Sequence, residues 1–363
     1  MTAAIHAKET NPLLDILILE KKNQLGKKIL ASGNGKCNLS NVRCENVQQT
    51  LDFFSRLGVI TRTDSEGRIY PYTEESRAIL DALKNRIEQL GIQVRTSAEV
   101  LEIEKKKDFI LHLNTGEIHA KKVLIACGGK AGSQFGTTGD GYRLAKAFGH
   151  RVDKPIPVLT AVDVKESMEK LAGIRVKAMV SLSYQDEIIF EEKGEIQFTK
   201  TGISGICVFN LSRYLLIPDG KTFQDGFDDY EIFIDFFPEE TEMLTLLEQR
   251  EKLGFSGEKL LEYLVRSPIA AQIYQLAQGD VAESAALLKA FPLSPKGVKG
   301  WDFAQATKGG VSFDDVDRKT LQSKLVSGLY FAGEVLDYDG PCGGYNLQNA
   351  WENGALVGKE MAR

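Results

Sequence analysis

The pattern of apolar and polar positions predicts a parallel α/β arrangement near the start of the chain. Residues 2–9 have helical periodicity, and the apolar run LDILILE follows and ends at Glu20. A continuous apolar run of this length is typical of a strand buried on both faces of a parallel sheet. Residues 74–90 predict a further helix, and the segment 91–129 predicts successive strands with a turn at 114–116.

The pattern changes after His150, where a predicted helix over 140–150 ends; Asp140 is placed to act as the N-cap of that helix. Residues 151–236 predict antiparallel strands, and residues 239–290 have helical periodicity with mixed charges, which indicates solvated outer faces of core helices. Tight turns and short apolar strands return from about residue 304.

The end of the chain resumes the α/β pattern. LYFAGE (329–334) predicts a buried strand, and 346–362 predicts a closing helix. We therefore expect two domains, one of them built from both ends of the chain. The predicted boundaries are 1–152 with 304–363 for the α/β domain and 153–303 for the inserted domain, mainly β over 153–237 and helical over 238–291.

Composition excludes several classes of protein. The 363 residues carry a formal net charge of −5 with scattered Lys and Arg, so no nucleic-acid footprint is expected. No apolar run approaches the ~18 residues that a membrane helix needs, and the start lacks a secretory pattern. The five cysteines and four histidines show no metal-ligand spacing, so we predict no metal site, no membrane partner and a cytoplasmic location.

A strand that ends in an acidic residue, as at Glu20, is typical of a dinucleotide-binding βαβ unit, in which the carboxylate accepts hydrogen bonds from the ribose hydroxyls. Alone the signal is weak, because many solvated strand ends carry Glu. The G-x-G-x-x-G turn is expected ~20 residues earlier, which is upstream of Met1. We therefore expect that the first strand and the phosphate loop are missing from this sequence. Either a segment has been omitted, or the protein is a natural shortened form that cannot hold FAD normally.

The loop GKKILASGNGKCNLSN (26–41) has the composition of a ligand loop. Gly33 and Gly35 allow close approach of a flat ligand, while Ser32 and Asn38 offer neutral hydrogen-bonding groups. A surface loop rich in turn residues is an equally good interpretation from composition. Cys37 is predicted to be a small buried residue rather than a nucleophile.

Two later segments combine a strand, glycines and a helix start. In VLIACGGKAGSQFGTTGDGYRLA, Gly128 and Gly129 let the chain turn against a dinucleotide, although an ordinary connection is the alternative. In GLYFAGEVLDYDGPCGGYNLQNAWENG, a helix starts near Asn346, and its N-terminal charge would stabilise a reduced flavin. Tyr345 and Cys342 in this loop are predicted to be structural.

Together these segments resemble the HI0933-like flavoproteins. The matching stretches are GKKILASGNGKCNLSN, EGRIYPYTEESRAILDAL, ACGGKAGSQFGTTGDGYRLAKAFGH, GEIQFTKTGISG, ATKGGVSFDDVDRKTLQSKLVSGLYFAGEVLD and GGYNLQNAWENG. The resemblance implies a glutathione-reductase-like, Rossmann-type FAD-binding domain with an inserted β-barrel-like domain and a helical insert. The chain departs from the family in the absent phosphate loop and in a shorter stretch after Asn41.

The resemblance also implies a set of cofactor-binding residues. Glu20 would hold the adenosine ribose, Val100 would contact adenine, and Glu334 would meet the ribityl chain. The full set is Glu20, Lys21, Ser32, Gly33, Gly35, Asn38, Val100, Gly128, Gly129, Gly333, Glu334, Gly344, Asn346 and Leu347. No catalytic acid or base is assigned.

We therefore expect an FAD-dependent oxidoreductase that moves a hydride between a small organic substrate and flavin N5, with NAD(P)H or O2 as the other partner. A reductase acting on a conjugated ketone and an oxidase acting on an amine both stay open. A tRNA-modifying flavoprotein is an alternative that the acidic balance disfavours. A cofactor-free interaction domain is the non-enzymatic alternative.

Overall fold

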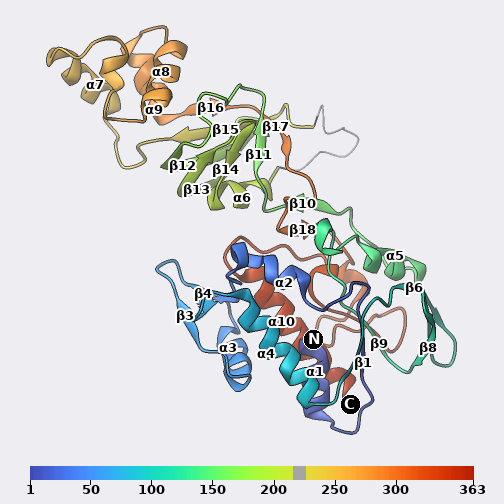
Figure 1. Cartoon of the computed structure of the whole chain (residues 1–363). Coiled ribbons are helices and arrows are strands. Elements are labelled where there is room, and N and C mark those ends of the chain that lie inside the picture. The colour runs from blue at the N-terminus through green and yellow to red at the C-terminus, as the bar shows by residue number, and fades with distance from the viewer. Residues whose placement is uncertain (216–225) are drawn as a thin grey trace. The chain divides into compact units, whose positions relative to one another are not determined.

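The computed structural model describes residues 1–215 and 226–363, and the chain divides into two compact units. Unit 1 comprises Met1–Pro157 and Gln305–Arg363, and unit 2 comprises Val158–Ala304. In Figure 1, unit 1 contains both the blue start and the red end of the chain. The first unit is thus built from both ends of the chain.

Parallel strand pairs form the centre of unit 1. β1 (Leu17–Leu19) pairs with β5 (Gln93–Arg95), and β9 (Val123–Ile125) pairs with β19 (Leu329–Phe331), both in parallel. Parallel pairing requires long crossover connections, which the intervening segments supply. Within residues 1–215 and 226–363, no strand joins the two pairs into one sheet.

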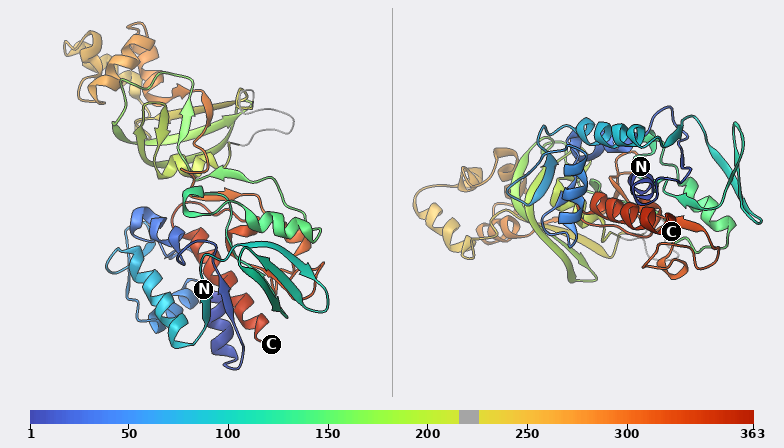
Figure 2. Two further views of the ribbon diagram at one scale, coloured as in Figure 1. Left: turned by 45° about the vertical axis from the view of Figure 1, so that its right-hand side comes forward. Right: turned by 90° about the horizontal axis from the view of Figure 1, so that it is seen from below.

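The first and last helices of unit 1 pack closely. α1 (Thr2–Thr10) lies against α10 (Tyr345–Met361), so the two chain ends lie side by side (Figure 2). Gly358 allows this approach, because a Cβ there would lie 2.4 Å from the Ala3 carbonyl oxygen. This pairing positions the N-terminal end of α10 beside the glycine- and asparagine-rich loop.

The remaining elements of unit 1 surround these strands. An antiparallel meander, β6-β7-β8, contains the turn predicted at 114–116, and a small sheet has the order β2-β4-β3. The elements are α2 (Lys27–Ala31), η1 (Ser32–Gly35), β2 (Ser40–Asn41), α3 (Val47–Arg56), β3 (Thr61–Thr63), β4 (Arg68–Pro71), α4 (Ser76–Gln89), β6 (Val100–Lys105), β7 (Phe109–Leu113), β8 (Gly116–Ala120), η2 (Ser133–Phe135), α5 (Asp140–Ala147), β10 (Ile156–Val158), β18 (Ala306–Lys308), η4 (Phe313–Asp315) and η5 (Gly333–Val335).

Unit 2 is a curled antiparallel sheet. Its seven strands have the order β16-β15-β12-β13-β14-β11-β17. β16 (Phe291–Leu293) and β17 (Pro295–Val298) lie at opposite edges, yet only Ser294 separates them in sequence. The two edges must therefore meet, which gives the barrel-like domain that the resemblance implies.

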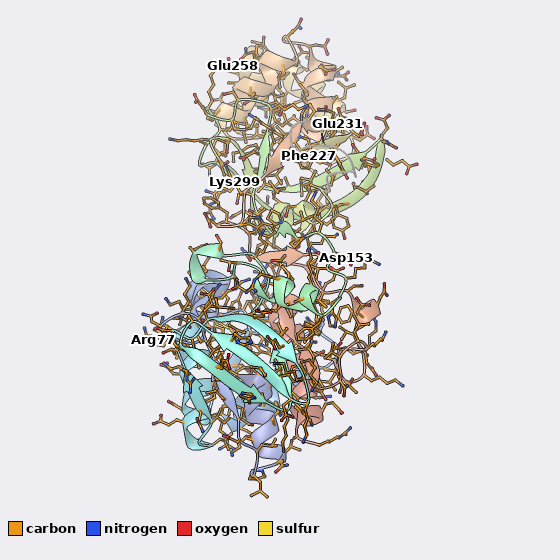
Figure 3. The ribbon with its side chains drawn as sticks, turned by 90° about the vertical axis from the view of Figure 1, so that its right-hand side faces the viewer. Arg77, Asp153, Phe227, Glu231, Glu258 and Lys299 are labelled. Atoms are coloured by element: carbon orange, nitrogen blue, oxygen red, sulfur yellow. The ribbon has the colours of Figure 1, made fainter. Side chains whose placement is uncertain are left out.

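The other elements of unit 2, except for the helix α6, follow the predicted pattern of strands and then helices. β15 (Tyr230–Asp235) alternates, so that Ile232 and Ile234 are buried while Glu231 is exposed. Figure 3 labels Glu231 and Phe227, the latter a buried core residue. The remaining elements are β11 (Val162–Val164), β12 (Arg175–Tyr184), β13 (Glu187–Phe198), β14 (Gly202–Ser204), α6 (Ile206–Ser212), α7 (Met243–Lys252), η3 (Gly257–Leu261), α8 (Ser267–Leu276) and α9 (Val281–Lys289).

Three sequence predictions of local structure are wrong. Asp140 is the first helical residue rather than the N-cap of α5, because its carboxylate pairs with the ammonium of Lys21 instead of capping backbone N–H groups. The strand at 329–334 ends at Phe331, since Gly333 has φ +75° and opens a 3₁₀ turn. α6 lies within a stretch predicted as strands only. Separately, among the described helices none is long and apolar enough to cross a membrane.

Candidate functional site

The loop of residues 32–41 docks onto the N-terminal end of α10. The Asn38 side-chain amide, oriented to satisfy both neighbours, donates to the Ser40 carbonyl at 3.0 Å and accepts from the Gly344 N–H at 3.2 Å. Asn41 Nδ2 donates to the Gly343 carbonyl at 3.1 Å, and Ser40 Oγ donates to Gln348 Oε1 at 2.6 Å. Three of these hydrogen bonds, to Gly343, Gly344 and Gln348, connect the loop directly to the helix end.

Close backbone approach at Gly344 holds this junction together. A Cβ at Gly344 would lie 2.4 Å from the Ser40 carbonyl oxygen, and its φ of +102° disfavours any other residue. The first N–H groups of a helix have no intrahelical acceptors, and in α10 no side chain of the described residues caps them. They therefore carry a partial positive charge, which suits an anionic group.

The glycines of the loop have different roles. A Cβ at Gly33 would lie 2.8 Å from the Asn38 backbone nitrogen, so Gly33 serves the folding of the loop itself. Next to Gly35 the nearest atom is 4.0 Å away, which leaves room for a ligand. Ser32 Oγ donates to the Ile29 carbonyl at 2.6 Å. Cys37 is fully buried, as predicted, and burial raises the pKa of its thiol to about 11.

A second group of contacts centres on Glu334, in the turn after β19. Its Oε1 accepts from the Thr307 N–H at 2.9 Å, and its Oε2 accepts from Lys28 Nζ at 2.5 Å. Only the remaining lone pairs of this carboxylate are available to sugar hydroxyls. The Lys28 contact also ties α2 to the strand end at Glu334, so it links the loop to the core of unit 1.

Thr307 is a central residue that the sequence did not reveal. Its Oγ1 accepts from the backbone N–H groups of Lys130 (2.9 Å) and Ala131 (3.0 Å). A Cβ at Gly129 would lie 2.4 Å from the same oxygen, whereas a Cβ at Gly128 would lie 3.8 Å from Glu334 Oε2. Its sequence signals are its place in the family-matching stretch that begins at Ala306 and its position before Gly309 and Gly310, and neither singles out its side chain.

Tyr142 completes this polar group. A Cβ at Gly129 would lie 3.0 Å from the Tyr142 hydroxyl oxygen. Burial, and then the negative charge of Glu334, raise the pKa of the Tyr142 phenol above its usual range. Tyr142 therefore remains a neutral hydrogen-bond donor at physiological pH.

The other predicted residues lie at strand and helix ends. Glu20 Oε1 accepts from the Lys22 N–H at 2.8 Å, and Lys21 Nζ donates to Thr138 Oγ1 at 2.6 Å and pairs with Asp140. The Val100 carbonyl accepts from Arg143 at 3.4 Å. Asn346 and Leu347 lie in the first turn of α10, and the Asn346 amide makes two 2.9 Å bonds with the backbone of Gly340.

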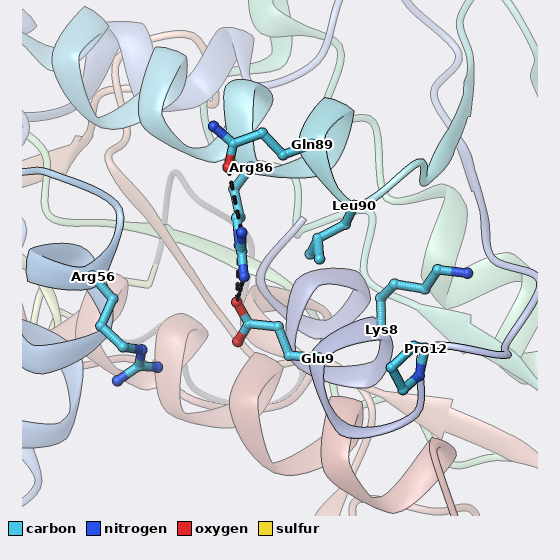
Figure 4. Close-up of a pocket in the computed structure, with 7 residues that line it drawn as sticks. All are labelled: Lys8, Glu9, Pro12, Arg56, Arg86, Gln89 and Leu90. Carbon is cyan, nitrogen blue, oxygen red and sulfur yellow. Dashed lines mark hydrogen bonds and ion pairs between the residues drawn. The ribbon is translucent and has the colours of Figure 1, made fainter.

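A cavity of about 840 Å³ lies elsewhere on unit 1 (Figure 4). Its lining residues come from α1, α3, α4 and their ends: Lys8, Glu9, Pro12, Arg56, Arg86, Gln89 and Leu90. The Arg86 guanidinium pairs with Glu9 at 2.7 Å across it. None of the residues predicted to bind the cofactor lines this cavity, so its volume gives no reason to place a flavin there.

Comparisons with known proteins identify the family of this chain and several relatives. Residues 45–360 match the family described as HI0933-like protein Rossmann domain. A 3-dehydro-bile acid delta(4,6)-reductase of Clostridium scindens is 33% identical, with 100% of this chain and 96% of the relative covered. A ribosomal RNA dihydrouridine synthase of Escherichia coli is 26% identical, with 95% and 92% covered.

One solved structure found in the comparison is the 3-ketosteroid-delta4-(5alpha)-dehydrogenase of Rhodococcus jostii RHA1. It is 14% identical with a TM-score of 0.48, and the comparison covers 100% of this chain and 94% of that one.

The residues present fit a flavin dinucleotide. The uncapped end of α10 suits the electron-rich edge of the flavin, a Cβ at Gly35 would meet no atom closer than 4.0 Å, and Glu334 offers acceptors to sugar hydroxyls. The family match spans most of the chain, and the reductase relative spans all of it. The chain therefore belongs to the HI0933-like protein family, as an FAD-dependent oxidoreductase with a Rossmann-type domain.

Proposed function

We propose that this protein is a reductase that saturates a carbon–carbon double bond conjugated to a carbonyl group, with a 3-dehydro bile acid as the substrate class. The supporting observation is 33% identity to the delta(4,6)-reductase over the full chain. The name of the second relative, a dihydrouridine synthase, also describes reduction of a ring double bond. A shared activated-alkene chemistry accounts for both names.

In the proposed reaction the cofactor carries out the chemistry and the protein binds and orients it, as in flavoenzymes generally. FAD, when bound, supplies hydride transfer between a nicotinamide donor and the substrate. The chain orients the cofactor and stabilises charge: the N–H groups at the start of α10 favour negative charge beside the loop of residues 32–41. We propose NAD(P)H as the donor because a net reduction of substrate requires an external source of electrons.

The side chains of the site have positioning roles in this proposal. Asn38 fixes the loop against the helix end, and Lys28 and Thr307 orient the Glu334 carboxylate toward sugar hydroxyls. The remaining members of the predicted set, Glu20 among them, line the dinucleotide path. Measurements of FAD binding, rather than of enzyme turnover, test the assignment of these residues.

The direct test is turnover under anaerobic conditions. The FAD-supplemented chain is mixed with NADH or NADPH and a bile acid that carries a 3-oxo-4,6-diene. We expect substrate-dependent loss of NAD(P)H absorbance and a product heavier by one or two pairs of hydrogens. Absence of bile-acid-dependent nucleotide oxidation, together with amine-dependent consumption of O2 in a parallel assay in air, would instead indicate an oxidase.

A second candidate function is reduction of uridine in ribosomal RNA. The observation that favours it is the similarity to two dihydrouridine synthases, at 26% and 25% identity. The net charge of −5 disfavours it, since RNA binding draws mainly on Lys and Arg contacts to phosphates. Appearance of dihydrouridine in an RNA fragment, detected by mass, would select this candidate over the bile-acid reductase.

Cofactor binding itself is tested separately. A visible absorption spectrum of the desalted protein, before and after incubation with FAD, reports bound flavin. Flavin bands that survive desalting support both candidate functions. A colourless protein would favour the interaction-domain alternative and overturn both.

A further inference from the structure

A small cavity in unit 2 carries an excess of positive charge. It measures about 350 Å³ and lies between the start of β12, the end of β15 and the loop before α8. Arg175, Lys177 and Arg266 line it, and among its described lining residues there is no carboxylate. Cations without matching acids around a concave surface are what an anionic ligand requires.

The pairing of these cations leaves two of them available. Arg175 pairs at 2.9 Å with Glu195, the β13 residue opposite Lys177. Lys177 and Arg266 are both exposed, and neither makes an ion pair or a side-chain hydrogen bond to another residue of the described ranges. Arg175 and Lys177 lie two residues apart on β12, so their side chains leave the same face of the sheet.

An aromatic side chain completes the cavity. Tyr263 is 83% exposed, and it has φ +67°, a left-handed conformation that is strained for a bulky residue. The backbone thus holds a large, exposed ring beside the cations. Phe237 and the buried Phe236 supply further aromatic surface.

We propose that this cavity binds a small anion that carries a planar ring, such as an aryl phosphate. Lys177 and Arg266 pair with the anionic group, and the Tyr263 ring stacks on the planar part. The volume lies near the lower end of the ~300–1,000 Å³ range of ligand pockets, which favours a small molecule. Every residue named for this site lies in unit 2, whereas the residues predicted to bind the cofactor lie in unit 1.

The test is a ligand-observed NMR titration of the full chain, with FAD present throughout. The probes are phenyl phosphate, inorganic phosphate and phenol. We expect phenyl phosphate to bind saturably and more tightly than either of the other two. Absence of saturable binding, equal affinity for inorganic phosphate, or release of flavin as the probe binds would each overturn the proposal.

Matched variants locate the binding. Lys177→Gln and Arg266→Gln should each weaken phenyl phosphate roughly tenfold, as expected for a lost charge-assisted contact. Tyr263→Asn keeps a residue that tolerates positive φ but removes the ring, so affinity should fall to that of inorganic phosphate. Lys252→Gln makes the same charge change on α7 outside the lining and should bind as the wild type does. Unchanged affinity in Arg266→Gln would overturn the proposal.

Discussion

At the scale of single residues, glycines mark where the chain contacts itself around the candidate flavin site. The Cβ contact predicted at Gly129, 2.4 Å from Thr307 Oγ1, involves the oxygen that also accepts from Lys130 and Ala131. Displacing that hydroxyl would break two backbone hydrogen bonds. A glycine is therefore needed at position 129 to leave space for the Thr307 hydroxyl. Its backbone conformation does not require glycine, because its φ is not in the left-handed region.

Gly129→Ala should consequently lower the free energy of unfolding by about 1–3 kcal/mol, the usual cost of overpacking, and weaken FAD binding. Urea unfolding and FAD titration measure the two effects. Gly297→Ala is the matched control, since no atom lies within 4 Å of the added Cβ and its φ is also ordinary. Equal effects of the two substitutions would contradict this interpretation.

The Lys28–Glu334 pair is a second residue-scale feature. The two side chains are 32% and 19% exposed, so solvent screens the pair partially. A double-mutant cycle with Lys28→Met and Glu334→Gln should give a coupling of about 0.5–1 kcal/mol in unfolding. In FAD titrations both single variants should bind FAD more weakly. Lys28→Met removes the cation that orients the Glu334 carboxylate, and Glu334→Gln removes the carboxylate itself. Additive unfolding energies would show that the pair makes no net contribution.

At the scale of elements, the important junction joins the loop of residues 32–41 to α10. Ser40 and Asn41 donate to Gln348 and to the Gly343 carbonyl, and the Asn38 amide oxygen accepts from the Gly344 N–H. Trp351, one turn further on, donates from Nε1 to the Leu39 carbonyl at 3.0 Å and packs on Phe54. Loop and helix should therefore respond to mutation as one element.

Gly344→Ala tests this junction, because the added methyl would meet the Ser40 carbonyl at 2.4 Å. We expect loss of about 2 kcal/mol or more in unfolding free energy and loss of flavin absorbance after desalting. Gly58→Ala is the control: it has a similar left-handed φ of +85°, but no atom within 4 Å. Flavin retention by Gly344→Ala would show that the helix end does not depend on the loop.

At the scale of the whole molecule, buried histidines couple stability to pH. Burial lowers the pKa of His6 from 6.5 to about 4, and burial also lowers the pKa of His150. Between pH 4 and 6.5 the unfolded chain binds more protons than the folded one, so stability rises with pH in this window and falls on acidification.

His6→Gln should therefore flatten the pH dependence of unfolding between pH 4 and 6.5, by roughly 2 kcal/mol or less because His6 is only partly shielded from solvent. Urea unfolding of both proteins across this range measures the difference. Other acid-sensitive groups act equally in both proteins and cancel. Parallel curves would show that His6 has an ordinary pKa in the folded state.

The sequence by itself determined the order and type of most elements. The apolar run before Glu20, the turn at 114–116 and the closing helix follow from periodicity and turn chemistry, which act over a few neighbouring residues. The resemblance that those segments carry identified the family correctly. The burial of Cys37 could also be predicted, as a thiol without a neighbouring base behaves as an apolar group.

Only the tertiary structure decided which side chains meet. Lys28 and Glu334 are 306 residues apart in sequence, and Thr307 contacts Lys130 from 177 residues away. Local patterns carry no information on such pairs, because chain topology alone brings the segments together. The same reason explains the error at Asp140, which the sequence presents as a helix cap: in the folded chain a distant lysine, Lys21, takes its carboxylate.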